Sequence, residues 1–315
     1  MNHASRPLML AEDAKGIAQA AAILRGGGLV AVPTETVYGL AARADRDESV
    51  AAIYRAKGRP SFNPLIVHVS DVEAARNLAV FDPRAQRLVD AFWPGPLTLV
   101  LPLREGAPIA RAVTAGLPTI ALRCPAHPVM RAAIAESGLP LAAPSANRSG
   151  AISPTTAAHV MASLGAAVDA VVDGGACAAG IESTIVALRA GGRWQVLRPG
   201  PIAEVRIADV LGCPPDAVTS MAIEAPGQLA SHYAPGKPVR LNAETAAEDE
   251  FHIGFGSVAG NVTLSAGGDL AEAAARLYAR LHDGAAASQP RIAVAPVPME
   301  GIGAAINDRL RRAAA

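Results

Sequence analysis

The sequence has no excess of charge and few aromatic residues. Its 28 Lys and Arg balance 28 Asp and Glu, and only 3% of its 315 residues are aromatic. A net charge of zero argues against a protein that coats nucleic acid non-specifically, because such coating needs surplus cations against phosphate. A mean hydropathy of +0.26 with 18% charged residues excludes intrinsic disorder. The core must therefore consist mainly of Ala, Val, Leu and Ile.

The sequence also lacks paired cysteines, a signal-peptide core and a membrane span. Cys124, Cys177 and Cys213 lie far apart, and none has a partner at C-x-x-C spacing, so we expect buried free thiols rather than a disulfide framework. The apolar run at 8–11 is too short for a signal peptide. The longest stretch without Asp, Glu, Lys or Arg, 149–168, is rich in Pro, Ser, Thr and Gly. We expect a soluble, cytoplasmic protein without membrane contact.

What the sequence does contain is a regular alternation of strand-like and helix-like segments. Short aliphatic runs predict strands over 29–32, 65–69, 97–101, 119–123, 170–172, 183–188 and 194–197. Periodic apolar residues predict helices over 11–25, 48–56, 71–78, 84–92, 127–137 and 155–164. We interpret this alternation as an α/β fold, an open sheet with a helical layer. The chain length suggests two domains.

A break in this pattern separates the two domains. The segment 225–238 has three Pro, two Gly and little apolar periodicity, which is typical of a linker. Beyond it, a smaller α/β set is predicted, with strands over 251–255, 261–264 and 291–295 and helices over 270–282 and 302–312. We therefore predict a catalytic domain over 1–222, a linker over 223–238 and a small second domain over 239–315.

Two polar segments of the first domain are candidates for a binding site. The first, 33–39, follows a strand, where ligands bind in open α/β sheets, although its threonines could equally cap a helix. The second, 57–64, places Lys57 and Arg59 around a glycine, where they could enclose a polyphosphate or form a solvated turn. It is not a P-loop. His68 lies in an apolar strand and could be a core residue instead.

Two later segments add small polar residues and arginines. The stretch 142–155 runs from a strand through hydroxyl-rich residues to a helix, where backbone amides favour an anion. Ser145 has neither a G-x-S-x-G context nor an evident His–Asp pair, which argues against a serine hydrolase. Arg123 and Arg198 each end a predicted strand and could reach a phosphate or carboxylate, or serve the structure alone.

These segments, taken in order, resemble the YrdC/Sua5 family, in its long Sua5 form of threonylcarbamoyl-AMP synthase. The resemblance covers about residues 12–210 and rests on PTETVYGL (33–40), KGRPSFNPLIVHV (57–69), FWPGPLTLVL (92–101), TIALRCPAHP (119–128), APSANRSGAISPT (143–155), GIESTIV (180–186) and LRPG (197–200). SHYAP (231–235) and the tail at 301–314 resemble the Sua5-specific extension. The family's linker often begins S-P-G-M, whereas this one reads A-P-G-Q, which puts the details of its closure in doubt.

The resemblance implies a fold, a reaction and its partners. The fold would be a YrdC-like twisted sheet over an electropositive cavity, followed by a small Rossmann-like Sua5 domain. The reaction would convert L-threonine, bicarbonate and ATP into threonylcarbamoyl-AMP, pyrophosphate and water. The product would pass to a downstream threonylcarbamoyl-transferase complex that modifies tRNA, so tRNA is only an indirect partner. Mg²⁺ would arrive with ATP, without a dedicated metal site or an organic cofactor.

The resemblance also assigns the site residues. Positions that hold L-threonine match Thr36, His68, Arg123 and Ser183. Positions that contact ATP match Arg59, Asn63, Thr119, Ala143, Ser145, Ser153 and Arg198, together with the catalytic K-x-R and S-x-N pairs, Lys57, Arg59, Ser145 and Asn147. Tyr233, with His232 beside it, matches the linker segment that folds over the nucleotide.

Two other functions share this kind of domain. Related single-domain proteins have been connected with RNA binding and ribosome maturation, but the neutral charge and the scarcity of aromatic residues argue against base stacking here. Hydrogenase-maturation carbamoyltransferases contain a similar domain, but the chain has no acylphosphatase or zinc-finger segment. The synthase is therefore the function that the sequence predicts, and the RNA-binding module is the alternative.

Overall fold

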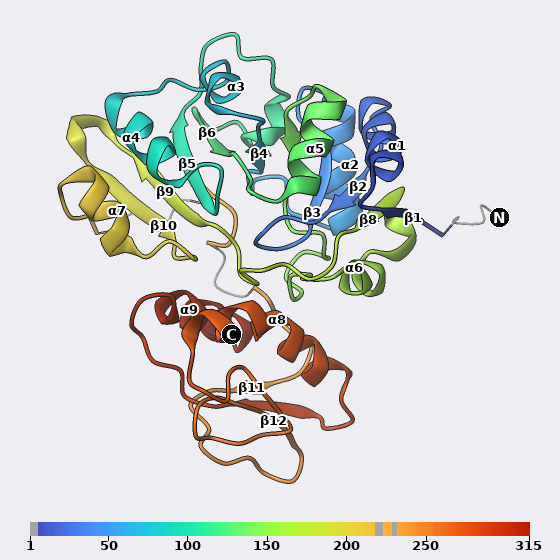
Figure 1. The fold of residues 1–315 in the computed structure, drawn as a ribbon, viewed down its shortest axis with the longest axis vertical. Helices are drawn as coiled ribbons and strands as arrows, with labels where there is room; N and C mark the ends of the chain where they lie inside the picture. The colour runs from blue at the N-terminus through green and yellow to red at the C-terminus, as the bar shows by residue number, and fades with distance from the viewer. Residues whose placement is uncertain (1–5, 218–222, 229–231) are drawn as a thin grey trace.

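The structure is a computed structural model that describes residues 6–217, 223–228 and 232–315. Position 222, where we place the end of the first domain, and Ser231 of the SHYAP segment lie outside the described residues. The described strands form two sheets, of ten and four strands. In Figure 1 the larger sheet and its helices occupy the upper part of the molecule, and the C-terminal part lies below.

The larger sheet is mixed, in the order β1-β8-β2-β3-β7-β4-β6-β5-β9-β10. Its strands are β1 (Leu8–Ala11), β2 (Val30–Val32), β3 (Gly39–Arg43), β4 (Ile66–His68), β5 (Leu97–Pro102), β6 (Thr119–Arg123), β7 (Leu141–Ala142), β8 (Ala170–Asp173), β9 (Thr184–Leu188) and β10 (Trp194–Arg198). The central pair, β4 and β6, is parallel, with His68 opposite Arg123. This register places the last residues of both strands side by side.

Helices cover one face of this sheet fully and the other face only in part. Their bounds are α1 (Ala14–Arg25), α2 (Asp47–Lys57), α3 (Val72–Arg76), α4 (Pro83–Phe92), α5 (Pro128–Ser137), α6 (Ala157–Ser163) and α7 (Glu204–Leu211), with short 3-10 helices at Arg111–Val113, Gly165–Ala167 and Ala190–Gly192. The fully covered face packs against α2, α3, α4, α6 and α7. On the opposite face, α1 and α5 pack over β8, β2, β3 and β7.

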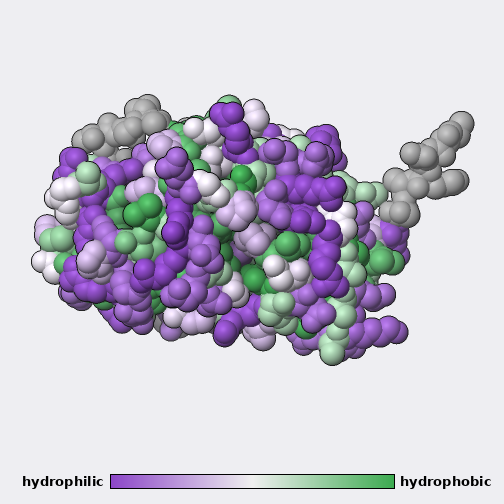
Figure 2. Space-filling model, turned by 90° about the horizontal axis from the view of Figure 1, so that it is seen from above, coloured by the Kyte–Doolittle hydropathy of each residue, from purple (hydrophilic) through white to green (hydrophobic). Residues whose placement is uncertain are grey.

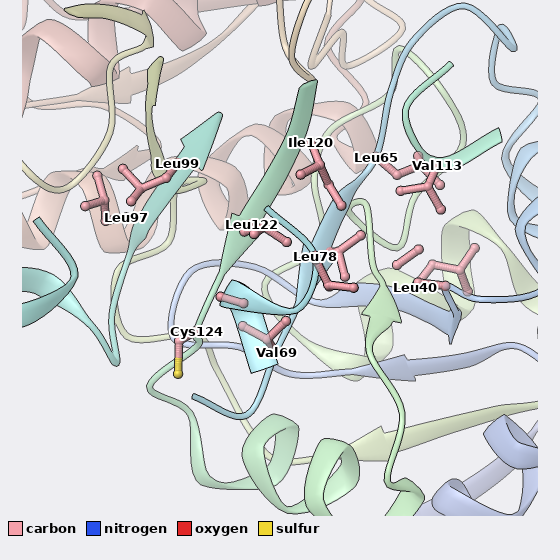
Figure 3. Packing of buried hydrophobic residues seen from close by; sticks show 14 of the residues in the cluster. Leu40, Leu65, Val69, Leu78, Leu97, Leu99, Val113, Ile120, Leu122 and Cys124 are labelled. Atoms are coloured by element: carbon pink, nitrogen blue, oxygen red, sulfur yellow. The ribbon is translucent and has the colours of Figure 1, made fainter. Parts of the chain in front are cut away.

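Strand alternation decides which side chains enter the core. Successive residues of a strand point to opposite faces, so Val67 of β4 and Leu122 of β6 join the helix-covered core, whereas Ile66 and Ala121 face the other way. Figure 3 shows this core, with Leu122 close to its neighbours from other strands and loops. Ile66 and Ala121 are covered instead by Ala225 of the linker, which is fully buried. This linker-covered half of the sheet leaves room for a cavity.

The C-terminal part has its own parallel sheet, in the order β11-β14-β12-β13. Its elements are β11 (Val239–Arg240), β12 (Glu250–Gly254), β13 (Val262–Thr263), α8 (Leu270–Ala286), β14 (Arg291–Val294) and α9 (Gly303–Ala313). In Figure 1, α8 and α9 lie between the small strands and the larger part. Their apolar core also includes Val37, Ile152 and Ile181 of the larger part. The two parts therefore share a buried interface.

The α/β fold predicted from the sequence is confirmed, and the differences concern weak segments. The strands β1, β3 and β11 and the helix α7 were not predicted, because they are short or, in β3, consist mainly of Gly and Ala with little strand propensity. The strand expected to run into the 142–155 segment is β7. The helix predicted from residue 11 begins at Ala14, after Asp13 caps it by accepting from the Gly16 amide. The threonines of the first candidate segment do not cap a helix, because β3 follows them. Cys124, Cys177 and Cys213 are free thiols, the first two buried.

Over the described part of the chain, no helix combines the length and the apolar character that crossing a membrane requires. Figure 2 shows one face of the molecule, on which hydrophilic residues predominate and apolar residues form separate small groups. Scattered apolar residues are ordinary on water-exposed surfaces.

Candidate active site

A cavity lies over the linker-covered half of the larger sheet. Nine of the residues predicted for the site line it: Thr36, Arg59, His68, Arg123, Ala143, Ser145, Ser183, Arg198 and Tyr233. The volume that the centre of a water molecule can reach inside is about 40 Å³, room for roughly three waters. The predicted residues therefore converge, and they enclose little free space.

One end of the cavity is built around Arg123, the last residue of β6. Its Nη2 lies 2.6 Å from Oε1 of Glu35, and its Nη1 donates to the Thr36 hydroxyl at 2.9 Å. Oε2 of Glu35 accepts from the amide of Ala126. Burial raises the pKa of Glu35, but the charge of Arg123 and the hydrogen bonds to the carboxylate outweigh burial and hold it below its usual value. Arg123 thus faces the cavity as half of an ion pair.

His68 stands beside Arg123 as a neutral base. It is 2% exposed, and among the described residues its Nδ1 has no hydrogen-bond partner. Burial, with the neighbouring charge of Arg123, lowers the pKa of His68 to about 3. Buried polar atoms nearly always find a partner, so an unpaired nitrogen in the wall of a cavity is available to a ligand.

A second group of lining residues, which we call the other end of the cavity, is built around Arg59. Gly58 takes a left-handed conformation at the end of α2, which turns the chain so that Arg59 enters the buried interior. The guanidinium donates to the Asn63 and Pro64 carbonyls and to Oδ1 of Asn63, at 2.6–3.2 Å. Burial lowers the pKa of Arg59 to about 10. Within the described ranges no carboxylate lies within ion-pair distance of Arg59.

Arg198, the last residue of β10, is the second cation of this end. Its Nε and Nη2 donate to the carbonyl and hydroxyl of Ser183 at 3.1 Å, and Nη1 reaches the Pro226 carbonyl at 3.4 Å. Gly227 permits the close approach of the linker, since a Cβ there would lie 2.9 Å from the Arg198 side chain. Like Arg59, Arg198 forms no ion pair with any carboxylate that the structure describes.

Lys57 is buried and does not line the cavity. Its Nζ donates to the carbonyls of Ser145 and Asn147, each at 2.5 Å, and so ties the end of α2 to the loop after β7. Burial, followed by the charge of Arg59, lowers its pKa well below the usual value. In this conformation Lys57 positions the loop that carries Ser145 rather than presenting its charge to the cavity.

Four more predicted residues lie outside the cavity lining. Asn63 accepts from Arg59, and Asn147 donates to the Arg148 and Ala151 carbonyls, so both support the cavity from behind. The Ser153 hydroxyl donates to Glu182 at 2.5 Å. Thr119 begins β6, four residues before Arg123, and is therefore on the same face of the strand about 13 Å away.

Two carboxylates at the cavity were not predicted as site residues: Glu182, which lines it, and Glu35, which pairs with the lining residue Arg123. Both lie inside segments singled out from the sequence, 33–39 and 180–186, but nothing in the spacing distinguishes them there. Burial raises the pKa of Glu182, yet the charge of Arg309, then that of Arg198, brings it down to about 2. Glu182 is therefore a buried carboxylate anion.

His232 and Tyr233 of the linker close the cavity. The His232 amide donates to the Arg312 carbonyl, and the Ala234 amide donates to the Gly150 carbonyl, so the segment bridges the two parts of the chain. Tyr233 has a φ of 65°, a left-handed conformation that is strained for a residue with a side chain. Such strain at the rim of a cavity suits a segment with a functional role.

Two family models together match most of the chain. The model with the description "Telomere recombination", of the Sua5/YciO/YrdC family, matches residues 22–200. The model described as "Threonylcarbamoyl-AMP synthase, C-terminal domain" matches residues 202–315.

Individual relatives agree with these matches. The chain is 47% identical to a threonylcarbamoyl-AMP synthase of Bacillus subtilis over 231 residues, which span 71% of this chain and 66% of that protein. It is 38% identical to a threonylcarbamoyl-AMP synthase of Pyrococcus abyssi, over 93% of this chain and 92% of that protein. The crystal structure of P. abyssi Sua5 in complex with L-threonine superposes with a TM-score of 0.88, at 35% identity, covering 98% of each chain.

Proposed function

Because the chain belongs to the Sua5/YciO/YrdC family, we propose that it converts L-threonine, bicarbonate and ATP into threonylcarbamoyl-AMP, pyrophosphate and water. It is an enzyme of the nucleotidyltransferase type, as its synthase relatives are. The observation that carries the proposal is a single cavity lined by Arg123, which is paired with Glu35, and by Arg59 and Arg198, which have no carboxylate partner among the described residues.

The Arg123 end suits the amino acid. A guanidinium binds a carboxylate as a two-pronged donor, and Glu35 beside it can accept hydrogen bonds from the α-amino group. The pair therefore complements both charges of a threonine zwitterion. The Thr36 hydroxyl and the unpaired Nδ1 of His68 offer neutral partners in the same place. P. abyssi Sua5 has been crystallised with L-threonine, which supports threonine as a ligand of this chain.

The Arg59 and Arg198 end suits the triphosphate. Phosphate oxygens need cations that no protein carboxylate has already neutralised, and both guanidiniums meet that requirement. Ser145 adds a hydroxyl from a loop that Lys57 holds through two carbonyls. We therefore assign phosphate contact to Arg59, Arg198 and Ser145, and positioning to Lys57, Asn63 and Asn147.

The chemistry then needs alignment more than covalent catalysis. The ammonium group of threonine first loses a proton to water, and the neutral amine then adds to the carbon of bicarbonate, with water leaving as the carbamate forms. If CO2 reacts instead, no water leaves and the nitrogen gives up a second proton to solvent. A carbamate oxygen attacks the α-phosphorus of ATP, a new P–O bond forms, and the bond to the β-phosphate oxygen breaks, releasing pyrophosphate. Fixing the reactants in line and stabilising charge on the phosphoryl oxygens supply most of such a rate enhancement.

We propose that Mg²⁺ enters with the ATP phosphates and neutralises part of their charge. The described residues contain no group of three His, Cys, Asp or Glu side chains suited to a metal. Glu182, which lines the cavity, and Glu35, which lies behind it against Arg123, are each held by an arginine. Oxygen ligands committed to guanidiniums do not suit a metal site, so the residues present fit a cation held mainly by phosphate and water.

The linker provides the cover. Since the closed cavity has room for only a few waters, His232 and Tyr233 must move away from Arg198 before ATP can enter. Their return would exclude water from the labile carbamate. We place the reaction in the cytoplasm, where ATP and tRNA are found, with a downstream threonylcarbamoyl-transferase complex as the consumer of the adenylate.

One assay tests the activity: pyrophosphate release from ATP, with L-threonine and bicarbonate each omitted in turn. We expect release only when both are present. Release that does not depend on threonine would contradict the proposal. RNA binding that survives replacement of Lys57 and Arg59, with no pyrophosphate release, would favour the RNA-binding module instead.

A further inference from the structure

The carboxylate of Glu182 is held largely from the C-terminal part of the chain. Nε of Arg309 in α9 lies 2.9 Å from its Oε2, and the hydroxyl of Tyr278 in α8 donates to the same oxygen at 2.8 Å. Ser153 of the larger part donates to the other oxygen. Every described partner of this carboxylate is therefore a donor, and two of the three belong to the second domain.

The interface that contains these contacts is tightly packed. Arg309 is fully buried, and its Nη1 pairs with Asp308 at 2.7 Å. A Cβ at Gly180, two residues before Glu182, would lie 2.4 Å from the backbone of Ala275 in α8. Close packing at both positions fixes the distance between the helices and the cavity wall.

Glu182 stands next to a cation that the reaction needs. Ser183, its neighbour in the sequence, accepts two hydrogen bonds from Arg198. Among the charged residues described around Glu182, the charge of Arg198 acts on the carboxylate second only to that of Arg309. Within the described residues the two side chains form no ion pair; Arg309 and Tyr278 hold one oxygen of Glu182, and Ser153 holds the other. If Arg309 were removed, we expect the Glu182 carboxylate to form an ion pair with Arg198.

We propose that Arg309 is a positioning residue through which the C-terminal domain keeps Arg198 available to the ATP phosphates: it neutralises Glu182, which would otherwise pair with Arg198. This inference rests on the proposed function and gives the second domain a part in phosphate binding. The same guanidinium lies 5.4 Å from the centre of the Tyr233 ring, so it also backs the linker residue that closes the cavity.

The test is a double-mutant cycle on Arg309→Met and Glu182→Gln, read as kcat and as KM for ATP and for threonine. We expect R309M to raise KM for ATP about 10-fold or more, the cost of losing a charge-assisted phosphate contact, and to leave KM for threonine within about threefold. E182Q in the R309M background should restore KM for ATP, because no carboxylate then competes for Arg198. R309K should retain most of the wild-type affinity.

The variants are chosen so that the fold survives. In E182Q, Arg309 keeps Asp308, and in R309M, Asp308 keeps Arg312. Arg276→Met, which removes a half-exposed ion pair with Glu272 from α8, is the matched control and should change no parameter by more than about twofold. If R309M does not fold, Tyr278→Phe can replace it, because it removes the other donor from the same oxygen of Glu182. We expect Y278F to raise KM for ATP by about 2- to 5-fold.

Two results would overturn the inference. One is an R309M or Y278F enzyme whose KM values for ATP and threonine rise equally. The other is a double variant no better than R309M, because a merely structural loss cannot be rescued by removing a second charge. If the wild-type enzyme itself releases no pyrophosphate, it is the proposed function that fails, and ATP affinity measured by calorimetry on the same variants still tests the role of Arg309.

Discussion

The two ends of the cavity treat their arginines in opposite ways. At the threonine end, Arg123 is paired with the carboxylate of Glu35. At the phosphate end, Arg59 and Arg198 have only carbonyl, amide and hydroxyl oxygens as described partners. Glu182 precedes Ser183, the residue to which Arg198 donates, and the charge of Glu182 is neutralised by Arg309 of the second domain.

This difference shows how one cavity can recognise two ligands of different charge. A zwitterion carries both signs and is matched by a paired wall, whereas a triphosphate carries only negative charge and is matched by cations without carboxylate partners. Which ligand each end of the cavity can bind therefore depends on which arginines are paired with a carboxylate. The four predictions below test or refine this contrast, in order of decreasing effect.

The largest effect is expected at Arg59. Arg59→Ala removes a phosphate-end cation and should reduce kcat/KM by about 10²- to 10³-fold, the usual cost of losing one donor that stabilises transition-state charge. Arg55→Ala, on the exposed side of α2, the helix that precedes Arg59, is the control and should stay near wild type. Pyrophosphate release measures both. Turnover that is unchanged in R59A would show that the phosphates bind elsewhere.

A smaller and more selective effect is expected at Glu35. Glu35→Gln should raise KM for threonine about 10- to 100-fold, since a hydrogen bond to a charged group is worth about 1.5–3 kcal/mol, and leave KM for ATP within about threefold. Glu48→Gln, on the surface, should change neither. A fall in KM for threonine would mean that Glu35 competes with the substrate for Arg123 instead of binding its amine.

The interface between the two domains allows a stability test with a close control. Gly180 has a φ of +71°, and a Cβ there would meet the backbone of α8, so Gly180→Ala should destabilise the protein by about 1–3 kcal/mol. Gly106 has a φ of +73° with nothing within 4 Å, so Gly106→Ala measures the backbone strain alone. Thermal unfolding of the two variants compares them. Equal losses would argue against tight packing at Gly180.

The smallest effect concerns two of the buried histidines, His68 and His232. The pKa values of His68 and His232 are each lowered to about 3 by burial and nearby cations. Below pH 6.5 the unfolded chain takes up a proton at each position that the folded chain refuses, so stability falls as the pH drops from about 6.5 toward 3. Between pH 7.5 and 5.5 each should cost about 1 kcal/mol.

Urea unfolding at these two pH values measures that slope. His68→Gln at the threonine end, or His232→Gln in the linker, should each remove about 1 kcal/mol from the loss. A variant with the full wild-type dependence would show that the corresponding histidine is protonated in the folded state.

Much of this site could be predicted from the sequence, for a physical reason. Arg123 and Arg198 end apolar runs, and a run of that kind fixes a strand, so their position at strand ends follows from local pattern. The ordered motifs that resemble the family then identified nine residues that the cavity brings together. The sequence did not predict β3, because its Gly and Ala residues have little strand propensity, and it did not give the bounds of β7, because that strand has only two residues.

The sequence could not reveal which partners hold each charge. Lys57 reaches carbonyls some 90 residues away, and Glu182 meets Arg309 across 127 positions. Such contacts depend on how distant parts of the chain pack together, and the spacing of motifs along the sequence does not reveal that packing. For the same reason, the sequence did not identify Glu35 or Glu182 as site residues, although both lie in candidate segments, 33–39 and 180–186.

The most direct test of the two-ended cavity is to titrate ATP and L-threonine separately into the Arg198→Met and Arg123→Met enzymes by calorimetry. The account predicts a crossed pattern: R198M loses affinity for ATP by about 10-fold or more and keeps that for threonine, and R123M does the reverse. If each variant weakened both ligands to the same extent, the two ends would not be separate, and the division of charge between them would be wrong.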